Sequence, residues 1–282
     1  SNLEGYFFLN PGKLIYFLRL SSLIVSCFSF FIVFLIFKKL NLNRYIYILF
    51  IISIFFSPFI LDISLIAGKN SLLLFIFILQ FYFFLKYFLK LENFNFNAYI
   101  IFSFLGCIAW GVNYWCASPT LYAICILHFY KYNLKKLNYI FFFFVVFCVF
   151  GILVNSYLTL DNPLNHLFSD KLFENQNYYE NSVKLNIFIK DIKNTLNIFY
   201  DYEKFLLVLL FLSIFLIKKL NNKFKAIYIS IFFLSIEPAI LFAVADYSYP
   251  QLRYFGPSII FMHLNLSIIL NLIIKEKLYQ NK

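Results

Sequence analysis

Long apolar runs, separated by short polar segments, constrain this chain more than any motif does. The bilayer core offers no hydrogen-bond partner, so a crossing segment must satisfy its own backbone, and a helix of about 20 apolar residues does so. Hydrophobic residues make up 62% of the chain, charged residues only 13%, and the mean hydropathy is +0.80. We therefore predict an all-α, polytopic transmembrane helical bundle that forms one domain over residues 1–282. About nine helices are expected, at residues 14–37, 45–60, 71–89, 98–113, 117–130, 138–157, 205–217, 226–245 and 254–274.

Two of the predicted helices are short for a crossing. The runs 117–130 and 205–217 fall below the roughly 17 residues that a perpendicular span needs. They are expected to be longer than the apolar run itself, to be tilted inside the bundle, or to be partly re-entrant. The pair covering 98–130 has the further alternative of a single re-entrant hairpin, which would leave the topology downstream unchanged.

Lysine and arginine orient the predicted helices, because short cytoplasmic loops collect positive charge. One side holds 15 of the 24 basic residues and two acids, Glu92 and Glu276, whereas the other holds nine basic residues and 11 acids. The basic side, which includes the C-terminus, is therefore predicted to be cytoplasmic. Its basic residues are Lys38, Lys39, Arg44, Lys86, Lys90, Lys131, Lys135, Lys136, Lys218, Lys219, Lys223, Lys225, Lys275, Lys277 and Lys282.

The net charge of +11 is thus a signal of topology. These cations are scattered over five short segments, which argues against a nucleic-acid partner and favours anionic lipid head groups as neighbours. The opposite side is predicted to be the outer face of the membrane. It holds residues 1–13, a polar hinge at Ser57–Asn70, the turn Trp115–Pro119, the segment 158–204 and the loop Ala245–Arg253.

The hinge lies at a membrane surface for reasons of solvation. Asp62 and Lys69 would each cost roughly 2.5 to 3.5 kcal/mol at the bilayer centre on insertion scales. Pro58 disfavours helical geometry at Ser57, which suits the end of a helix.

The segment 158–204 is the only sizeable stretch outside the predicted membrane helices, and we expect it to be an extracytoplasmic loop. It opens with a turn-rich string from Thr159 to Leu164. Apolar residues then recur at helical spacing from Leu185 to Phe199, with Lys190 and Lys193 on other faces. This pattern predicts an amphipathic helix that lies on the outer membrane surface or packs on the rim of the bundle.

No signature of a soluble enzyme occurs in the sequence. The five cysteines are an odd number without metal-ligand spacing, and they are expected to be small core residues. The three histidines are far apart in the sequence, and each is expected to have a structural role. Among the histidines, His166 is the best candidate for a phosphate contact or a proton carrier. These residues are Cys27, Cys107, Cys116, Cys125, Cys148, His128, His166 and His263.

Four ionisable residues in or near the predicted outer boundary are candidates for function, because such groups in a membrane are costly. Glu237 lies near the middle of its run, next to Pro238, which would loosen the helix. The alternative to a functional role for Glu237 is a structural one, in which its carboxyl pairs with a buried base or is protonated. Arg19, Lys69 and Arg253 are candidates to bind a lipid-linked phosphate, since a guanidinium binds phosphate oxygens bidentately. For the two arginines the alternative is snorkelling to the outer head groups.

Six short motifs, in order and spacing, resemble the C-type superfamily of membrane glycosyltransferases. They resemble the branch that includes the protein O-mannosyltransferases and the lipid A aminoarabinose transferases, over about residues 11 to 274. Each motif alone is weak. They are Arg19-Leu20-Ser21-Ser22, Lys38-Lys39-Leu40, Ser57-Pro58, Gly68-Lys69-Asn70, Asn155 followed by Asp161-Asn162-Pro163-Leu164, and Arg253-Tyr254 with Pro257.

The resemblance implies an enzyme that transfers a sugar from a polyprenyl-phosphate-linked donor to a lipid, glycan or protein on the outer face of a bacterial inner or plasma membrane. No cofactor is implied with certainty, although a divalent metal would fit the chemistry. The residues expected to bind substrate are Arg253, Tyr254, Lys69, Asn70, Arg19, Glu237, His166, Asp62 and Asp161.

In this family the catalytic base is an acid in the first outer loop. The sequence departs from that pattern, because it starts with Ser1 and has only Glu4 upstream of Arg19, without flanking residues of the family's acidic motif. We expect a preceding segment to carry the base and residues 1–282 alone to be inactive. A polysaccharide polymerase, a flippase or solute transporter, and a purely structural membrane protein are the alternative functions.

Overall fold

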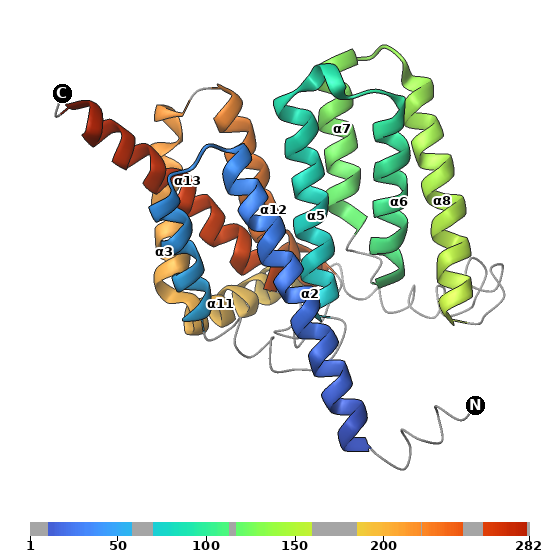
Figure 1. Ribbon diagram of the computed structural model, residues 1–282, viewed down its shortest axis with the longest axis horizontal. Helices are drawn as coiled ribbons and strands as arrows, with labels where there is room; N and C mark the ends of the chain where they lie inside the picture. Colours follow the sequence, from blue (N-terminus) through green and yellow to red (C-terminus); the bar gives the residue numbers. More distant parts are fainter. Residues whose placement is uncertain are drawn as a thin grey trace. The chain divides into compact units, whose positions relative to one another are not determined.

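The computed structural model describes residues 11–57, 70–112, 117–159, 185–220, 222–244 and 256–280. These residues are helical apart from short connections, and no strand occurs among them, so the predicted all-α class is confirmed for this part of the chain (Figure 1). The helices are α2 (Pro11–Lys39), α3 (Arg44–Phe55), α5 (Asn70–Leu89), η1 (Leu91–Asn93), α6 (Phe96–Val112), α7 (Ser118–Tyr132), α8 (Leu137–Thr159), α11 (Leu185–Ser213), η3 (Ile214–Lys219), α12 (Asn222–Val244) and α13 (Gly256–Gln280).

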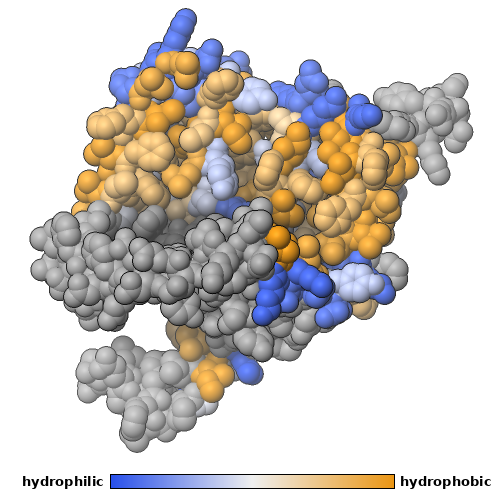
Figure 2. All heavy atoms as spheres, turned by 180° about the vertical axis from the view of Figure 1, so that it is seen from behind, coloured by the Kyte–Doolittle hydropathy of each residue, from blue (hydrophilic) through white to orange (hydrophobic). Residues whose placement is uncertain are grey.

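Three stretches are long and apolar enough to cross a membrane: Ile15–Lys39, Ser71–Leu89 and Pro257–Ile274. Apolar side chains cover the flanks of the helices, and hydrophilic residues gather toward their ends (Figure 2). Many large apolar side chains on these flanks are exposed, as Phe28 and Phe31 are on α2. These findings support a membrane protein, whereas a crossing by each of the nine predicted helices remains a prediction.

The chain divides into two compact units. Unit 1 comprises residues 1–75, 198–238 and 251–282, and unit 2 comprises residues 76–197 and 239–250. Several helices contribute to both units, because the boundaries fall within α5, α11 and α12.

In unit 1, helix α3 packs beside α13. Asn43 caps α3 by accepting a hydrogen bond from the Tyr45 backbone, which satisfies one of the amides left open at a helix start. The Asn43 backbone amide in turn donates to Asn271 Oδ1 at 3.1 Å. This bond joins the start of α3 to the C-terminal half of α13, so the polar connection after Lys39 lies beside the end of the chain that carries Lys275.

In unit 2, helices α6, α7 and α8 pack together, with α6 and α8 in the closest association. Gly106 makes this possible: a Cβ there would lie 2.7 Å from the Phe147 ring and 3.2 Å from Thr120. At one end of the unit, Lys131 Nζ donates to the carbonyls of Glu92 and Phe94, at 2.9 and 2.5 Å. The connection after α5 therefore lies beside the end of α7, and the lysines of both segments share that end.

Helix α11 (Leu185–Ser213) is kinked between two segments that the sequence predicts to be separate. The predicted amphipathic helix lies before the kink, and the apolar run 205–217 begins after it and continues into the 3₁₀ turns of η3. The backbone leaves helical geometry at Glu203, where φ is −131° and ψ is 42°. The short run 205–217 is thus the second part of a longer, interrupted helix.

Candidate functional site at the end of α3

Two serines mark the end of α3 that faces away from Asn43. Ser53 lies in the last turn, and Ser57 lies one turn later, just after the helix has ended. The Ser57 amide still donates to the Ile54 carbonyl, at 3.1 Å, but Pro58 follows and disfavours further helix. Each of these serines bonds a titratable group from another helix, and we call Ser53 and Ser57 together the serine edge.

Ser57 donates a hydrogen bond to Oε1 of Glu203, across 146 residues of sequence. Both partners are buried, with 2% of Ser57 and 9% of Glu203 exposed. The contact joins the two points of unit 1 at which α3 ends and α11 leaves helical geometry. Because water is excluded, burial raises the pKa of the Glu203 carboxyl, and the Ser57 hydroxyl partly offsets this by bonding to the carboxylate.

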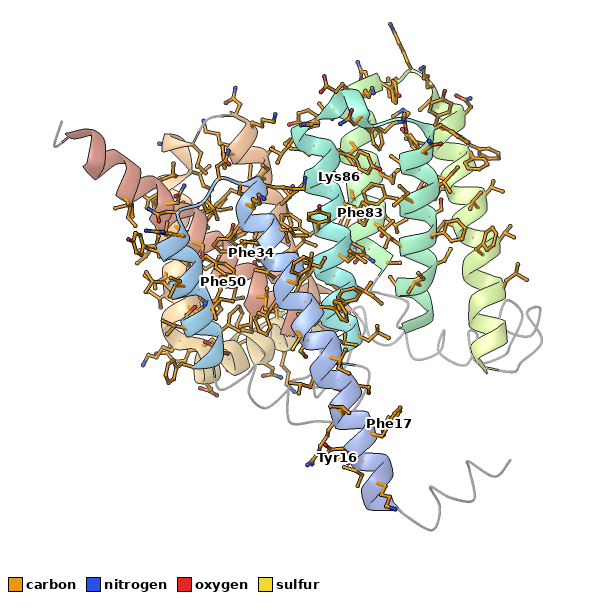
Figure 3. All side chains as sticks on the ribbon, in the orientation of Figure 1. Tyr16, Phe17, Phe34, Phe50, Phe83 and Lys86 are labelled. Atoms are coloured by element: carbon orange, nitrogen blue, oxygen red, sulfur yellow. The ribbon has the colours of Figure 1, made fainter. Side chains whose placement is uncertain are left out.

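Ser53 holds His263 of α13, with 3.0 Å between Ser53 Oγ and His263 Nδ1. Ser53 Oγ also donates to the Phe50 carbonyl at 2.9 Å. The Phe50 ring, labelled in Figure 3, packs edge-on to the imidazole with 6.3 Å between centroids.

The other ring nitrogen of His263, Nε2, is buried, and no hydrogen-bond partner contacts it within the described residues. The serine edge therefore binds two titratable groups from two other helices: the Glu203 carboxyl from α11 and the His263 imidazole from α13.

On α11, Asp201 and Lys204 lie close to Glu203 in the sequence, and both are exposed. A hydrogen bond with Tyr200, and the electrostatic interaction with the same phenol, raise the pKa of Lys204. The Lys204 ammonium also lies 4.9 Å from the centre of the Tyr200 ring. The only charged residue of α3, Arg44, is at its other end. Glu203 is thus held by a neutral hydroxyl, and it depends on Ser57 for its orientation.

No group of three or more potential metal ligands occurs in the described part of the chain. Glu203 and His263 are each bonded by a separate serine hydroxyl, and a carboxyl and an imidazole are both side chains that can exchange a proton or bond a hydroxyl group.

Two residues predicted to bind substrate have described side chains. Arg19 is exposed on α2, and Glu237 is buried on α12. Asn70 is the first residue of α5, although its side chain lies outside the described residues, as do the six other predicted positions. These are Asp62, Lys69, Asp161, His166, Arg253 and Tyr254.

Ser57 belongs to the predicted polar hinge, whereas Glu203 is not among the predicted site residues and His263 is predicted to be structural. The sequence does contain a feature that points to Glu203 as a candidate. It is an acid two residues before the apolar run 205–217, at the expected depth of the membrane boundary. For His263 the signal is weaker, since Ser53 and His263 are 210 residues apart and only packing of α3 against α13 joins them.

No family model matches the chain, and neither a curated protein nor a solved structure matches it.

Proposed function

We propose that the protein transfers a sugar from a polyprenyl-phosphate-linked donor to a hydroxyl of a lipid, glycan or protein acceptor at the outer face of the membrane. The observation that carries this proposal is the buried carboxylate of Glu203, held by Ser57 at the start of the polar hinge. Transfer from a phosphate-linked sugar needs a carboxylate to activate the acceptor hydroxyl, and cationic groups to stabilise the departing phosphate.

The N-termini of two helices support the binding of a donor phosphate. Helix α5 begins at Asn70, directly after Lys69, and α13 begins at Gly256, three residues after Arg253. The amides of a helix N-terminus and its dipole favour an anion, and the predicted phosphate-binding residues come just before both starts. A lipid-phosphate donor has its scissile bond at the membrane surface, which is where helices of this kind begin and end.

The depth of the carboxylate agrees with the same chemistry. Glu203 lies three residues before the apolar stretch Leu206–Lys218, with Lys204 between them, which places its carboxyl at the boundary between polar segment and apolar helix. A sugar attached to a membrane-embedded lipid presents its anomeric carbon at that level. A transporter for such a lipid would instead require interrupted helices near the midplane in both halves of the chain.

The experiment supplies membranes containing the full-length protein with radiolabelled polyprenyl-phosphate mannose, and in parallel with polyprenyl-phosphate aminoarabinose. Transfer of label from the donor into lipid, glycan or protein fractions is expected for one of them. Membranes without the protein are the control. If neither donor loses label but purified protein in vesicles moves the donor between leaflets, the glycosyltransferase proposal is wrong and a flippase is favoured.

A further inference from the structure

We propose that the turn between α7 and α8 binds the head group of an anionic phospholipid, with Lys135 and Lys136 in contact with its phosphate. The turn lies within unit 2, at the end where η1 and α7 meet. The inference does not rest on the proposed function, because it involves neither a sugar donor nor an acceptor.

Positive charge is concentrated at this end of unit 2. Residues 86–97 and 131–139 hold five lysines and one acid, Glu92. Lys131 joins the two segments through its bonds to the carbonyls of Glu92 and Phe94. Within the described part of the chain, no carboxylate pairs with any of the five lysines, so an anion meets a net positive charge here. They are Lys86 (labelled in Figure 3), Lys90, Lys131, Lys135 and Lys136.

Two tyrosine rings hold the side chain of Lys136. Its ammonium lies 4.8 Å from the centre of the Tyr132 ring and 5.5 Å from that of Tyr139. The two rings pack edge to face, with 6.0 Å between centroids. An ammonium has three N–H donors, and those that point away from the rings are available to a phosphate oxygen. Because the rings already restrict the lysine, binding costs less side-chain entropy than it would at a mobile surface lysine.

The backbone of the turn is fixed as well. The Lys135 amide donates to the Tyr132 carbonyl at 2.9 Å, and the Tyr139 amide donates to the Lys136 carbonyl at 2.9 Å. Lys135 and Lys136 are both exposed on this turn. Lys131, in contrast, uses its ammonium for the two carbonyls of the other segment, so it serves the fold. The turn therefore presents two lysines whose backbone positions are set before a ligand arrives.

An exposed apolar stripe on α8 begins directly after Lys136. Its members follow one another at spacings of four, three and four residues, so they share one face of the helix. At 1.5 Å per residue the stripe is about 16 Å long, close to half of the roughly 30 Å hydrocarbon core of a bilayer. An acyl chain can lie along it while the head group reaches the lysines, which favours a phospholipid over a free anion. The stripe consists of Leu137, Phe141, Phe144 and Cys148.

The test titrates the full-length protein, purified in detergent, with dioleoyl phosphatidylglycerol and in parallel with dioleoyl phosphatidylcholine. Native mass spectrometry measures the affinity of the first bound lipid. The wild type should bind the anionic lipid more tightly. Lys135→Gln/Lys136→Gln should weaken that binding about 30-fold and leave phosphatidylcholine unchanged, because each lysine near anionic lipid contributes about fivefold in affinity.

Lys135→Gln alone changes one exposed side chain and keeps the backbone bonds of the turn, so it tests the inference even if the double variant does not fold. It should weaken phosphatidylglycerol binding about fivefold. Lys38→Gln/Lys218→Gln is the matched control, because it removes the same charge from two exposed lysines of unit 1. This control should keep the wild-type affinity.

Three results would overturn the inference. The first is equal affinity of the wild type for the two lipids, which is ordinary contact with the bilayer. The second is an equal loss in the two double variants, which is an effect of net charge. The third is displacement of phosphatidylglycerol by inorganic phosphate at the same concentration, which shows a site for a free anion. Sugar transfer is not measured, so each of these results leaves the proposed function untouched.

Discussion

At the scale of single residues, small side chains and hydroxyls decide where these helices meet. Gly106 lets α6 approach α8, and its surroundings are rigid: the Phe147 ring is buried and stacks on Phe143 with 5.8 Å between centroids. Ser53 and Ser57 each bind a titratable group from another helix of unit 1. In both places, one atom more or less at a single position changes the packing of two helices.

Gly106→Ala is expected to destabilise unit 2 by about 1–3 kcal/mol, because the new methyl group would lie 2.7 Å from the buried Phe147 ring, so that the ring or the helix must shift. The higher helix propensity of alanine, about 1 kcal/mol, offsets only part of this cost. Thermal unfolding in detergent measures the effect.

Gly12→Ala is the control, since nothing lies within 4 Å of a Cβ at Gly12 in α2. That variant should unfold at or slightly above the wild-type temperature. Equal unfolding temperatures for Gly106→Ala and Gly12→Ala would show that the close approach of α6 and α8 is not what requires glycine.

Glu203 is expected to make the stability of the protein depend on pH. Burial raises its pKa in the folded state, so between the usual carboxyl pKa and the raised one the folded protein binds more protons than the unfolded chain. The free energy of unfolding therefore falls as pH rises through that window. Glu203→Gln has no proton to lose, so its unfolding temperature should fall less than that of the wild type over the same range. Parallel curves for the two proteins would contradict a buried, raised carboxyl.

At the scale of elements, hydropathy predicted where the helices lie. Each apolar run overlaps a helix in the described residues, since runs of this length satisfy their backbone only as helices. The predicted division between the amphipathic segment 185–199 and the run 205–217 coincides with the kink at Glu203, where the backbone leaves helical geometry. The hydrogen bond between Ser57 and Glu203 could not be predicted from the sequence, because a bond between residues 146 apart leaves no pattern in local spacing.

Helix α11 is expected to lie on the membrane surface before Glu203. Ile189 and Leu196, seven residues apart and so on one face, are exposed, as are Lys190 and Lys193. An interfacial helix places such apolar residues at the acyl boundary and its lysines toward water. In a cysteine-free background, a spin label at Leu196→Cys should then be relaxed by oxygen, which concentrates in lipid, and one at Lys193→Cys by a water-soluble nickel reagent.

The alternative, packing on the rim of the bundle, gives a different result for the same labels. A label at Leu196→Cys would be immobile and shielded from both reagents, while Lys193→Cys would stay accessible from water. That outcome would assign α11 to the bundle and remove the surface helix.

At the scale of the whole molecule, each unit brings basic segments together at one end. In unit 1, the Asn43–Asn271 bond places the connection after Lys39 beside the lysine-rich end of α13. In unit 2, Lys131 joins the connection after α5 to the end of α7, next to Lys135 and Lys136. Because cytoplasmic loops collect lysine and arginine, we predict that both ends face the cytoplasm.

Accessibility of single cysteines tests this topology, with one reporter at the basic end of each unit. Lys38→Cys in unit 1 and Lys135→Cys in unit 2 occupy exposed positions and should react with a membrane-impermeant thiol reagent only after the cells are opened. Lys193→Cys, in the predicted outer segment, should react in intact cells and serves as the positive control. If Lys38→Cys and Lys135→Cys gave opposite results, the basic ends of the two units would face opposite sides. Charge would then not be a sufficient guide to the topology, and the outer location of the Ser57–Glu203 contact would have to be established separately.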